Sequence, residues 1–166
     1  AVSGTPNKLS ISWFTNSNAG GAVSLLSGGD TPLLKKWPSN TPPVVEAQLI
    51  EFGGGTKLSS LDGKADGTSN THTLSLYPLS AGSNDFRFAD DFRHGGNSLK
   101  PVRCVSDGSA VYACTASLTL PSDSPAGVSR FLRLTTRYNK ASFIVSMHND
   151  SGVIKFNGVQ PKVDST

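Results

Sequence analysis

Residues 114–120 read Cys-Thr-Ala-Ser-Leu-Thr-Leu, so that small or apolar side chains alternate with hydroxyl side chains at every position. Alternation with a period of two is typical of a strand that has one face buried and the other in water. The same alternation recurs at residues 9–13, 45–49, 72–76, 130–138 and 143–147. These segments predict seven or eight strands.

The connections between these segments are rich in turn-forming residues, and the whole chain holds 17 Gly and 10 Pro among 166 residues. Short strands separated by such turns favour an antiparallel arrangement. We therefore expect a mainly β fold, an antiparallel β-sandwich-like single domain over residues 1–166, with long loops and at most one short helix. The best helical spacing lies at Thr31–Trp37, where Pro38 ends it.

The hydrophobic fraction of 36% is low, and Ser, Thr and Gly rather than charged residues make up the difference. Only 16% of the residues are charged, and the net charge is +3. A chain of this kind is not disordered by charge repulsion, and its length allows a real core. No apolar run is long enough to span a membrane. The longest basic run is Lys35-Lys36, so the sequence does not favour nucleic-acid binding.

The two cysteines, Cys104 and Cys114, flank a segment that contains the turn sequence Ser106-Asp107-Gly108-Ser109. Asp-Gly between strand-like runs indicates a hairpin, and opposed positions on a hairpin come close enough for a disulfide. We favour a disulfide over two free thiols, and with it an oxidising, extracytoplasmic setting. Two cysteines without a nearby His pair do not make a zinc site.

The sequence has none of the motifs of a hydrolase elbow, a phosphate-binding loop or a zinc protease. The three histidines, His72, His94 and His148, are far apart in the sequence, and we expect them on the surface or at strand edges. We therefore assign no catalytic residue, no metal ligand and no cofactor. An enzyme whose site assembles from dispersed Asp, His and Arg residues is a third, weaker hypothesis.

The densest polar segment is residues 85–94, where Asp85, Asp90 and Asp91 alternate with aromatic residues and with arginines that include Arg93. One interpretation is a Ca²⁺ site built from the acidic side chains. The other is an ordered loop that covers its own phenylalanines while its charges pair in water. Either way, these four residues are candidate surface contacts.

A second basic series comprises Arg130, Arg133, Arg137 and Lys140. Arg133 and Arg137 share one face of a predicted strand, and they are candidate surface contacts for an acidic partner. The alternative is a solvated strand edge, where charges prevent aggregation of sheets. Trp13 fits a core position, whereas Trp37 is left open between core and a sugar-binding groove.

Several segments resemble PilX-type type IV minor pilins of Saccharibacteria and related small bacteria. The resemblance rests on residues 129–140 and 153–166, on 36–43 leading into 45–49, on 69–78, and on Tyr112–Ala116 with Leu118 and Pro121. It covers about two-thirds of the chain, in strand-and-turn motifs rather than in a catalytic signature. The cysteine pair of that family also resembles Cys104 and Cys114.

The resemblance implies a structural subunit of a type IV pilus, with this chain as an outward-facing head that has a role in adhesion to a host cell or surface. It implies a leader and a long apolar N-terminal helix that anchors the precursor in the cytoplasmic membrane and binds other pilin subunits. It also implies a final C-terminal strand. None of these segments is in the sequence, so we expect an extracellular fragment of a longer subunit, with a host-cell protein or glycan as its contact. The alternative is a free-standing extracellular carbohydrate- or protein-binding β-sandwich module.

Overall fold

The computed structural model of the chain describes residues 6–25, 37–53, 57, 71–80, 97–106, 110–121 and 129–154. Eight strands and one short helix occupy these residues. They are β1 Lys8–Trp13, α1 Asn16–Ala19, β2 Val44–Phe52, β3 Thr71–Ser80, β4 Asn97–Cys104, β5 Cys114–Thr119, β6 Ser129–Arg137, β7 Phe143–Asn149 and β8 Gly152–Ile154. The expectation of a mainly β, single-domain fold with at most one short helix is confirmed.

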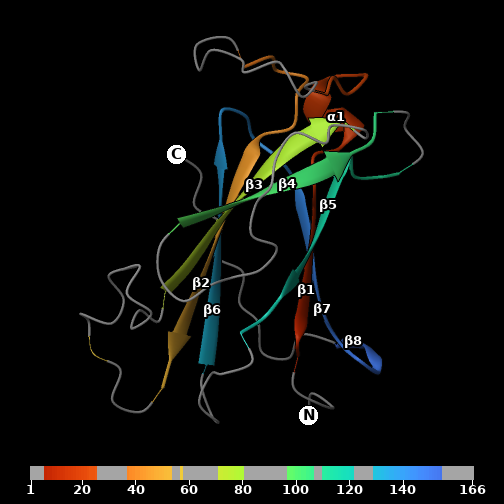
Figure 1. Cartoon of the computed structure of the whole chain (residues 1–166). Coiled ribbons are helices and arrows are strands. Elements are labelled where there is room, and N and C mark those ends of the chain that lie inside the picture. Colours follow the sequence, from red (N-terminus) through yellow and green to blue (C-terminus); the bar gives the residue numbers. More distant parts are fainter. Residues whose placement is uncertain are drawn as a thin grey trace.

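All eight strands belong to one sheet in the order β6-β2-β3-β4-β5-β1-β7-β8. In Figure 1, β2 and β6 lie on one side and β1 and β7 on the other, and β3 and β4 slant across between them. The sheet is open and curled, so that one continuous sheet makes the sandwich-like arrangement. Most neighbours are antiparallel, but β3 and β4 are parallel, which the turn pattern did not predict.

Apolar and polar residues alternate in the sequence, and in the structure the apolar ones are buried and the polar ones are more exposed. On β1, Leu9, Ile11 and Trp13 are buried while their neighbours are not, and β5 repeats this pattern at every second position. The inward-facing side chains of β1, β2, β3 and β5 form one continuous core cluster. We call the side of each strand that faces this cluster its inner face and the opposite side its outer face.

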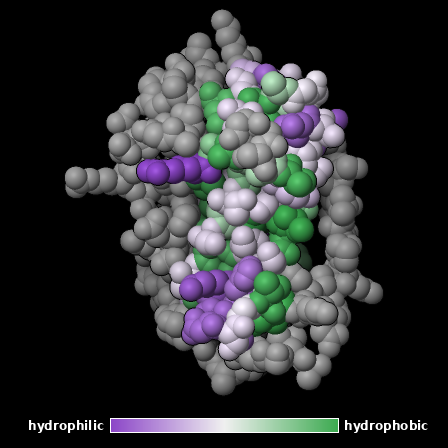
Figure 2. All heavy atoms as spheres, turned by 90° about the vertical axis from the view of Figure 1, so that its right-hand side faces the viewer, coloured by the Kyte–Doolittle hydropathy of each residue, from purple (hydrophilic) through white to green (hydrophobic). Residues whose placement is uncertain are grey.

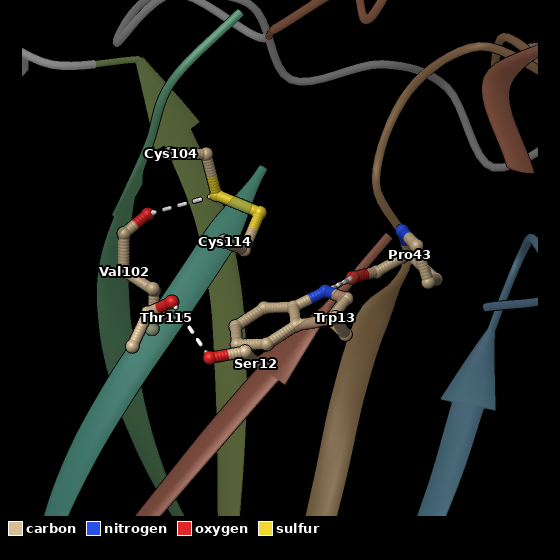
Figure 3. The surroundings of a disulfide bond; sticks show 7 residues. All are labelled: Ser12, Trp13, Pro43, Val102, Cys104, Cys114 and Thr115. Carbon is tan, nitrogen blue, oxygen red and sulfur yellow. Dashed lines mark hydrogen bonds between the residues drawn. A yellow bond between two sulfur atoms is a disulfide. The ribbon is translucent and has the colours of Figure 1, made fainter. Parts of the chain in front are cut away.

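The curl brings the start of β2 against the end of β1. The indole Nε1 of Trp13 donates a hydrogen bond of 3.2 Å to the carbonyl oxygen of Pro43, directly before β2. Figure 3 shows this contact beside the sulfur atoms of Cys104 and Cys114. Trp13 has no exposed surface, so it is the core residue that the sequence indicated. Its one polar atom is satisfied there, as a buried indole requires.

The predicted disulfide is present. Cys104 at the end of β4 and Cys114 at the start of β5 are paired in register, their Cα atoms are 4.3 Å apart, and both are fully buried. No other cysteine exists. The bridge therefore joins two antiparallel neighbours at the point where the chain turns from one to the other.

The helix predicted at Thr31–Trp37 lies outside the described residues, apart from Trp37, which is not helical. The helix that the described residues contain begins after Thr15. Thr15 caps this four-residue helix, and its third residue, Asn18, bonds back to Thr15 in a capping box. Within the described residues, no helix has the length and apolar character needed to cross a membrane.

A difference from the predicted strands concerns β4. No strand was predicted between residues 76 and 114, but Asn97–Cys104 form one. Lys100 and Pro101 interrupt any alternation here, and Pro within a run argues against a strand assignment. The parallel partner β3 supplies the pairing that the local sequence does not indicate.

Candidate functional site

The outer face of β6 and β2 carries large side chains that the core does not use. On β6 these are Phe131, Arg133 and Arg137, all exposed, and on β2 Glu46, Gln48 and Ile50 lie beside them. Strand register places Gln48 opposite Arg133 and Ile50 opposite Phe131. We call this surface, together with Trp37, Tyr77 and Tyr138, the aromatic–arginine face.

Three aromatic rings meet at one end of this face. Tyr138, directly after β6, stacks on Trp37 with ring centroids 4.8 Å apart and an angle of 26° between the planes. Tyr77 of β3 meets the same indole edge to face, at 6.2 Å and 89°. Both are favourable aromatic geometries. The cluster therefore joins β3, the end of β6 and the segment before β2, which are far apart in the sequence.

Hydrogen bonds and backbone geometry fix the position of Tyr138. The side-chain Nδ2 of Asn139 donates to the carbonyl oxygens of Pro38 and Thr41, each at 2.8 Å. Tyr138 itself has a φ of 79°, in the left-handed region that a bulky residue rarely adopts. The turn after β6 is thus bound to the segment that contains Trp37, and this turn holds the Tyr138 ring in place at some cost in backbone strain.

The polar atoms of the aromatic cluster have distinct surroundings. Burial, and then the neighbouring Tyr138, raise the pKa of Tyr77 above its usual value of 10.0, so its hydroxyl stays protonated at neutral pH. The indole nitrogen of Trp37 is buried and has no hydrogen-bond partner. Tyr138 is 48% exposed although one of its faces is covered by Trp37.

The basic series from the sequence divides into two sets. Arg133 and Arg137 lie on the outer face, where Arg137 donates a 3.0 Å hydrogen bond to Glu46 and remains 56% exposed. Arg130 turns to the inner face instead, so the prediction of a solvated edge was wrong for this residue. The sequence could have predicted this position of Arg130, because Leu132 and Leu134 follow it at every second residue and face the core.

Arg130 belongs to a buried ionic cluster at the end of the core. Its Nε donates a 2.8 Å hydrogen bond to one carboxylate oxygen of Glu51, and the other oxygen lies 3.3 Å from Nε2 of His72. Arg130 also donates a 2.8 Å hydrogen bond to the carbonyl oxygen of Pro121, beyond β5. These contacts tie β2, β3 and β6 to the chain that leaves β5.

This cluster corrects the expectation for His72, which was placed at the surface or at a strand edge. It has no exposed surface, and Glu51 is 4% exposed. Glu51 continues the alternating buried series Val45, Ala47 and Leu49, so its burial could have been predicted from the sequence. Its contacts with Arg130 and His72 could not, because strand pairing brings these residues together from distant parts of the sequence.

Of the other candidate contacts, Asp85, Asp90, Asp91 and Arg93 lie outside the described residues, as does His94. The described part of the chain holds no group of three or more His, Cys, Asp or Glu side chains arranged for a metal ion. Trp37, which the sequence left open, is half-buried in the aromatic cluster and not in the core cluster.

The chain matches no known protein-family model, no curated protein and no solved structure. The site is therefore argued from its own chemistry. An exposed aromatic ring beside a paired arginine and glutamate binds by stacking and hydrogen bonding, and the aromatic–arginine face is the strongest candidate for contact among the described residues.

Proposed function

We propose that this chain is the outward-facing head of a type IV pilus subunit, a structural and adhesive domain with no catalytic residues. The observation that carries the extracytoplasmic part of this proposal is the buried disulfide between Cys104 and Cys114. Disulfides persist in oxidising compartments and outside the cell. A mainly β domain with a disulfide and few charged residues is suited to that environment.

The pilus part of the proposal rests on the sequence resemblance to minor pilins. One of the resembling segments, residues 36–43, leads into β2 and contains Trp37, and another, Tyr112–Ala116, contains a cysteine of the disulfide. In this proposal a membrane helix beyond this chain joins the subunit to others, and the head lies at the cell surface. The resembling residues are thus parts of the fold and of the candidate contact face.

The aromatic–arginine face supports the adhesive part. Exposed aromatic and arginine side chains are enriched in binding surfaces, and Phe131, at 54% exposed, and Arg133 add nothing to the core cluster. Large apolar side chains in water favour association, so a subunit gains from them only where they meet a partner. We propose a host-cell surface protein or glycan as that partner.

Cell fractionation tests the proposal. An antibody raised against this domain is applied to cells that produce the full-length protein, and filaments sheared from the surface are collected. We expect the antibody to label filaments in electron micrographs and to detect the protein in the sheared fraction. Finding the protein only in the medium, with unlabelled filaments, would contradict the pilus assignment.

Protein found only in the medium would favour the alternative function, a free-standing extracellular binding module for a carbohydrate or a protein. The observation that favours it is the Trp37–Tyr138 stack, which offers a contact surface without requiring a filament. The two functions share an extracytoplasmic location and differ in attachment, which fractionation measures directly.

A further inference from the structure

We propose that Tyr138 and Trp37, with Tyr77, Arg137 and Glu46 at their margin, form a binding site for a neutral sugar ring of a surface polysaccharide. This inference deepens the adhesive role proposed above and rests on it for its biological meaning. The chemistry of the site is argued from this face alone.

The first argument is the exposed ring face. The Trp37 indole stacks on one face of the Tyr138 ring, with centroids 4.8 Å apart, and Tyr138 is still 48% exposed. About half of this residue therefore stays accessible to a ligand despite the stack. The face of an aromatic ring is electron-rich, and the C–H bonds on the apolar side of a pyranose carry a weak positive charge. A flat sugar ring is thus a natural third member of this stack.

The second argument is that the protein holds the ring in place before binding. The positive φ of Tyr138 is an unusual conformation for an aromatic residue, and such outliers gather at ligand-binding sites. The two hydrogen bonds from Asn139 to Pro38 and Thr41 fix the turn that contains it. A ring that is already ordered loses little entropy when a ligand stacks on it, so even a small contact area gives measurable affinity.

The third argument is the polar margin. The guanidinium of Arg137 and the carboxylate of Glu46 form a hydrogen-bonded pair, and their side chains are 56% and 30% exposed. Sugar hydroxyls can accept from the first and donate to the second. A purely apolar partner would desolvate this pair without replacing its hydrogen bonds with water, which is costly. Arg137 and Glu46 offset each other's charge, so the margin they form favours a neutral, hydroxyl-rich ligand.

The two tryptophans provide a built-in reporter. Trp37 lies in the site, whereas Trp13 has no exposed surface and is hydrogen-bonded in the core. The chain is titrated with short oligosaccharides of glucose, galactose, mannose and N-acetylglucosamine while tryptophan fluorescence is recorded, and binding is measured in parallel by calorimetry. We expect at least one oligosaccharide to bind and to change the fluorescence to saturation. In Trp37→Phe the fluorescence response should vanish.

Tyr138→Gly removes the ring and suits the positive φ, so it should fold. We expect it to weaken binding by about two- to tenfold, the value of one aromatic stacking contact. Ile144→Ala is the matched control, because Ile144 is an equally exposed large apolar residue on β7, outside the aromatic–arginine face, and its loss should leave the affinity unchanged. Unchanged fluorescence of the buried Trp13 in a Trp37→Phe background checks that each variant is folded.

Three outcomes overturn the inference: no oligosaccharide binds, Tyr138→Gly binds as tightly as the parent, or Ile144→Ala weakens binding equally. A protein occupant would show itself if attachment to target cells survives periodate oxidation of their sugars and is lost after protease treatment. The fractionation experiment is independent of these results. Labelled filaments without sugar binding leave the pilus proposal standing, and sugar binding without labelled filaments leaves the site standing.

Discussion

The two sides of the curled sheet have the same kind of inner face and different outer faces. On β5 and β1 the outer side chains are mostly small and hydroxylated, and strand register aligns Ser117 and Ser10 with Ser146 of β7. The same side of β7 also carries Ile144, which is exposed. On β6 and β2 the outer side chains include the exposed aromatic and arginine residues of the candidate site.

Figure 2 views the first of these sides, where pale and green atoms run along the middle and strongly hydrophilic atoms are confined to patches. Short side chains contact one another on this side, as in the 2.8 Å hydrogen bond between the hydroxyls of Ser12 and Thr115. Short hydroxyl side chains satisfy the strand pattern and give a partner little to hold. The outer faces of β1 and β5 therefore show that these strands pair without large outer side chains, whereas β6 and β2 gather aromatic and arginine side chains on one surface.

The two sides also close their ends differently. At the β4–β5 junction Cys104 and Cys114 form a covalent link. Where β2 ends and β3 and β6 begin, the link is the ion pair of Glu51 with Arg130, and His72 lies beside the same carboxylate. A buried ionic cluster is costly to break because each remaining charge stays desolvated. This contrast sets the order of the following predictions.

The largest effect is expected from Glu51→Ala. It removes the carboxylate that contacts both Arg130 and His72, and breaking a buried ion pair costs about 3–5 kcal/mol of unfolding free energy. Urea unfolding measures the loss. Glu46→Ala is the matched control, because its pair with Arg137 is exposed and is worth at most about 1 kcal/mol. Equal losses in the two variants would show that burial does not distinguish the pairs.

The next effect is expected from Cys104→Ala/Cys114→Ala. Opening a loop between residues ten apart restores chain entropy to the unfolded state, which lowers the unfolding free energy by about 3 kcal/mol. Urea unfolding of the parent with and without a reducing agent gives the same comparison without mutation. If reduction leaves the transition unchanged, covalent closure contributes nothing to this side of the sheet.

A smaller effect concerns pH and the aromatic cluster. Because burial and then Tyr138 raise the pKa of Tyr77 above 10.0, the unfolded chain loses this proton before the folded chain does. The contribution of Tyr77 to the free energy of unfolding is fully present below pH 10 and is lost as the pH rises through the pKa of the folded state. Tyr77→Phe should make the parent's alkaline decline of unfolding free energy less steep. An identical slope in parent and variant would contradict this, and Tyr112→Phe is the position control.

The smallest effect is expected on the hydroxyl side. Ser117 is exposed on β5, so Ser117→Ala should change the unfolding free energy by less than about 0.5 kcal/mol and leave oligosaccharide affinity unchanged. Thermal unfolding and calorimetry measure the two quantities. A loss of affinity here would remove the functional distinction between the two outer faces.

Much of this architecture follows from local sequence. Alternation identified β1, β5 and the centres of β2, β3 and β7, and the Asp-Gly turn with its flanking cysteines indicated the disulfide. These features depend on neighbours within a few residues. The N-cap at Thr15 also had a local signal, since Thr is among the residues favoured at this position.

The sites depend on pairing between distant strands, which local patterns do not encode. Nothing near Arg130 indicates that Glu51 would be its register partner, and nothing near Tyr138 indicates that Trp37 would lie beneath its ring. For the same reason the parallel pairing that makes Asn97–Cys104 a strand was missed. Sequence reasoning named Trp37 and Arg137 as candidates, and only the fold shows that they share a face.

The position of β1 has a consequence for how the chain is made. This first strand, which ends at Trp13, is flanked by β5, which begins at Cys114, and by β7, which begins at Phe143. During synthesis it must wait for most of the polypeptide to emerge before either neighbour exists. Long-range pairing of this kind folds slowly. The cysteines are only ten residues apart and can meet much earlier. The disulfide at the β4–β5 junction can therefore form before β1 has paired with β5 and β7.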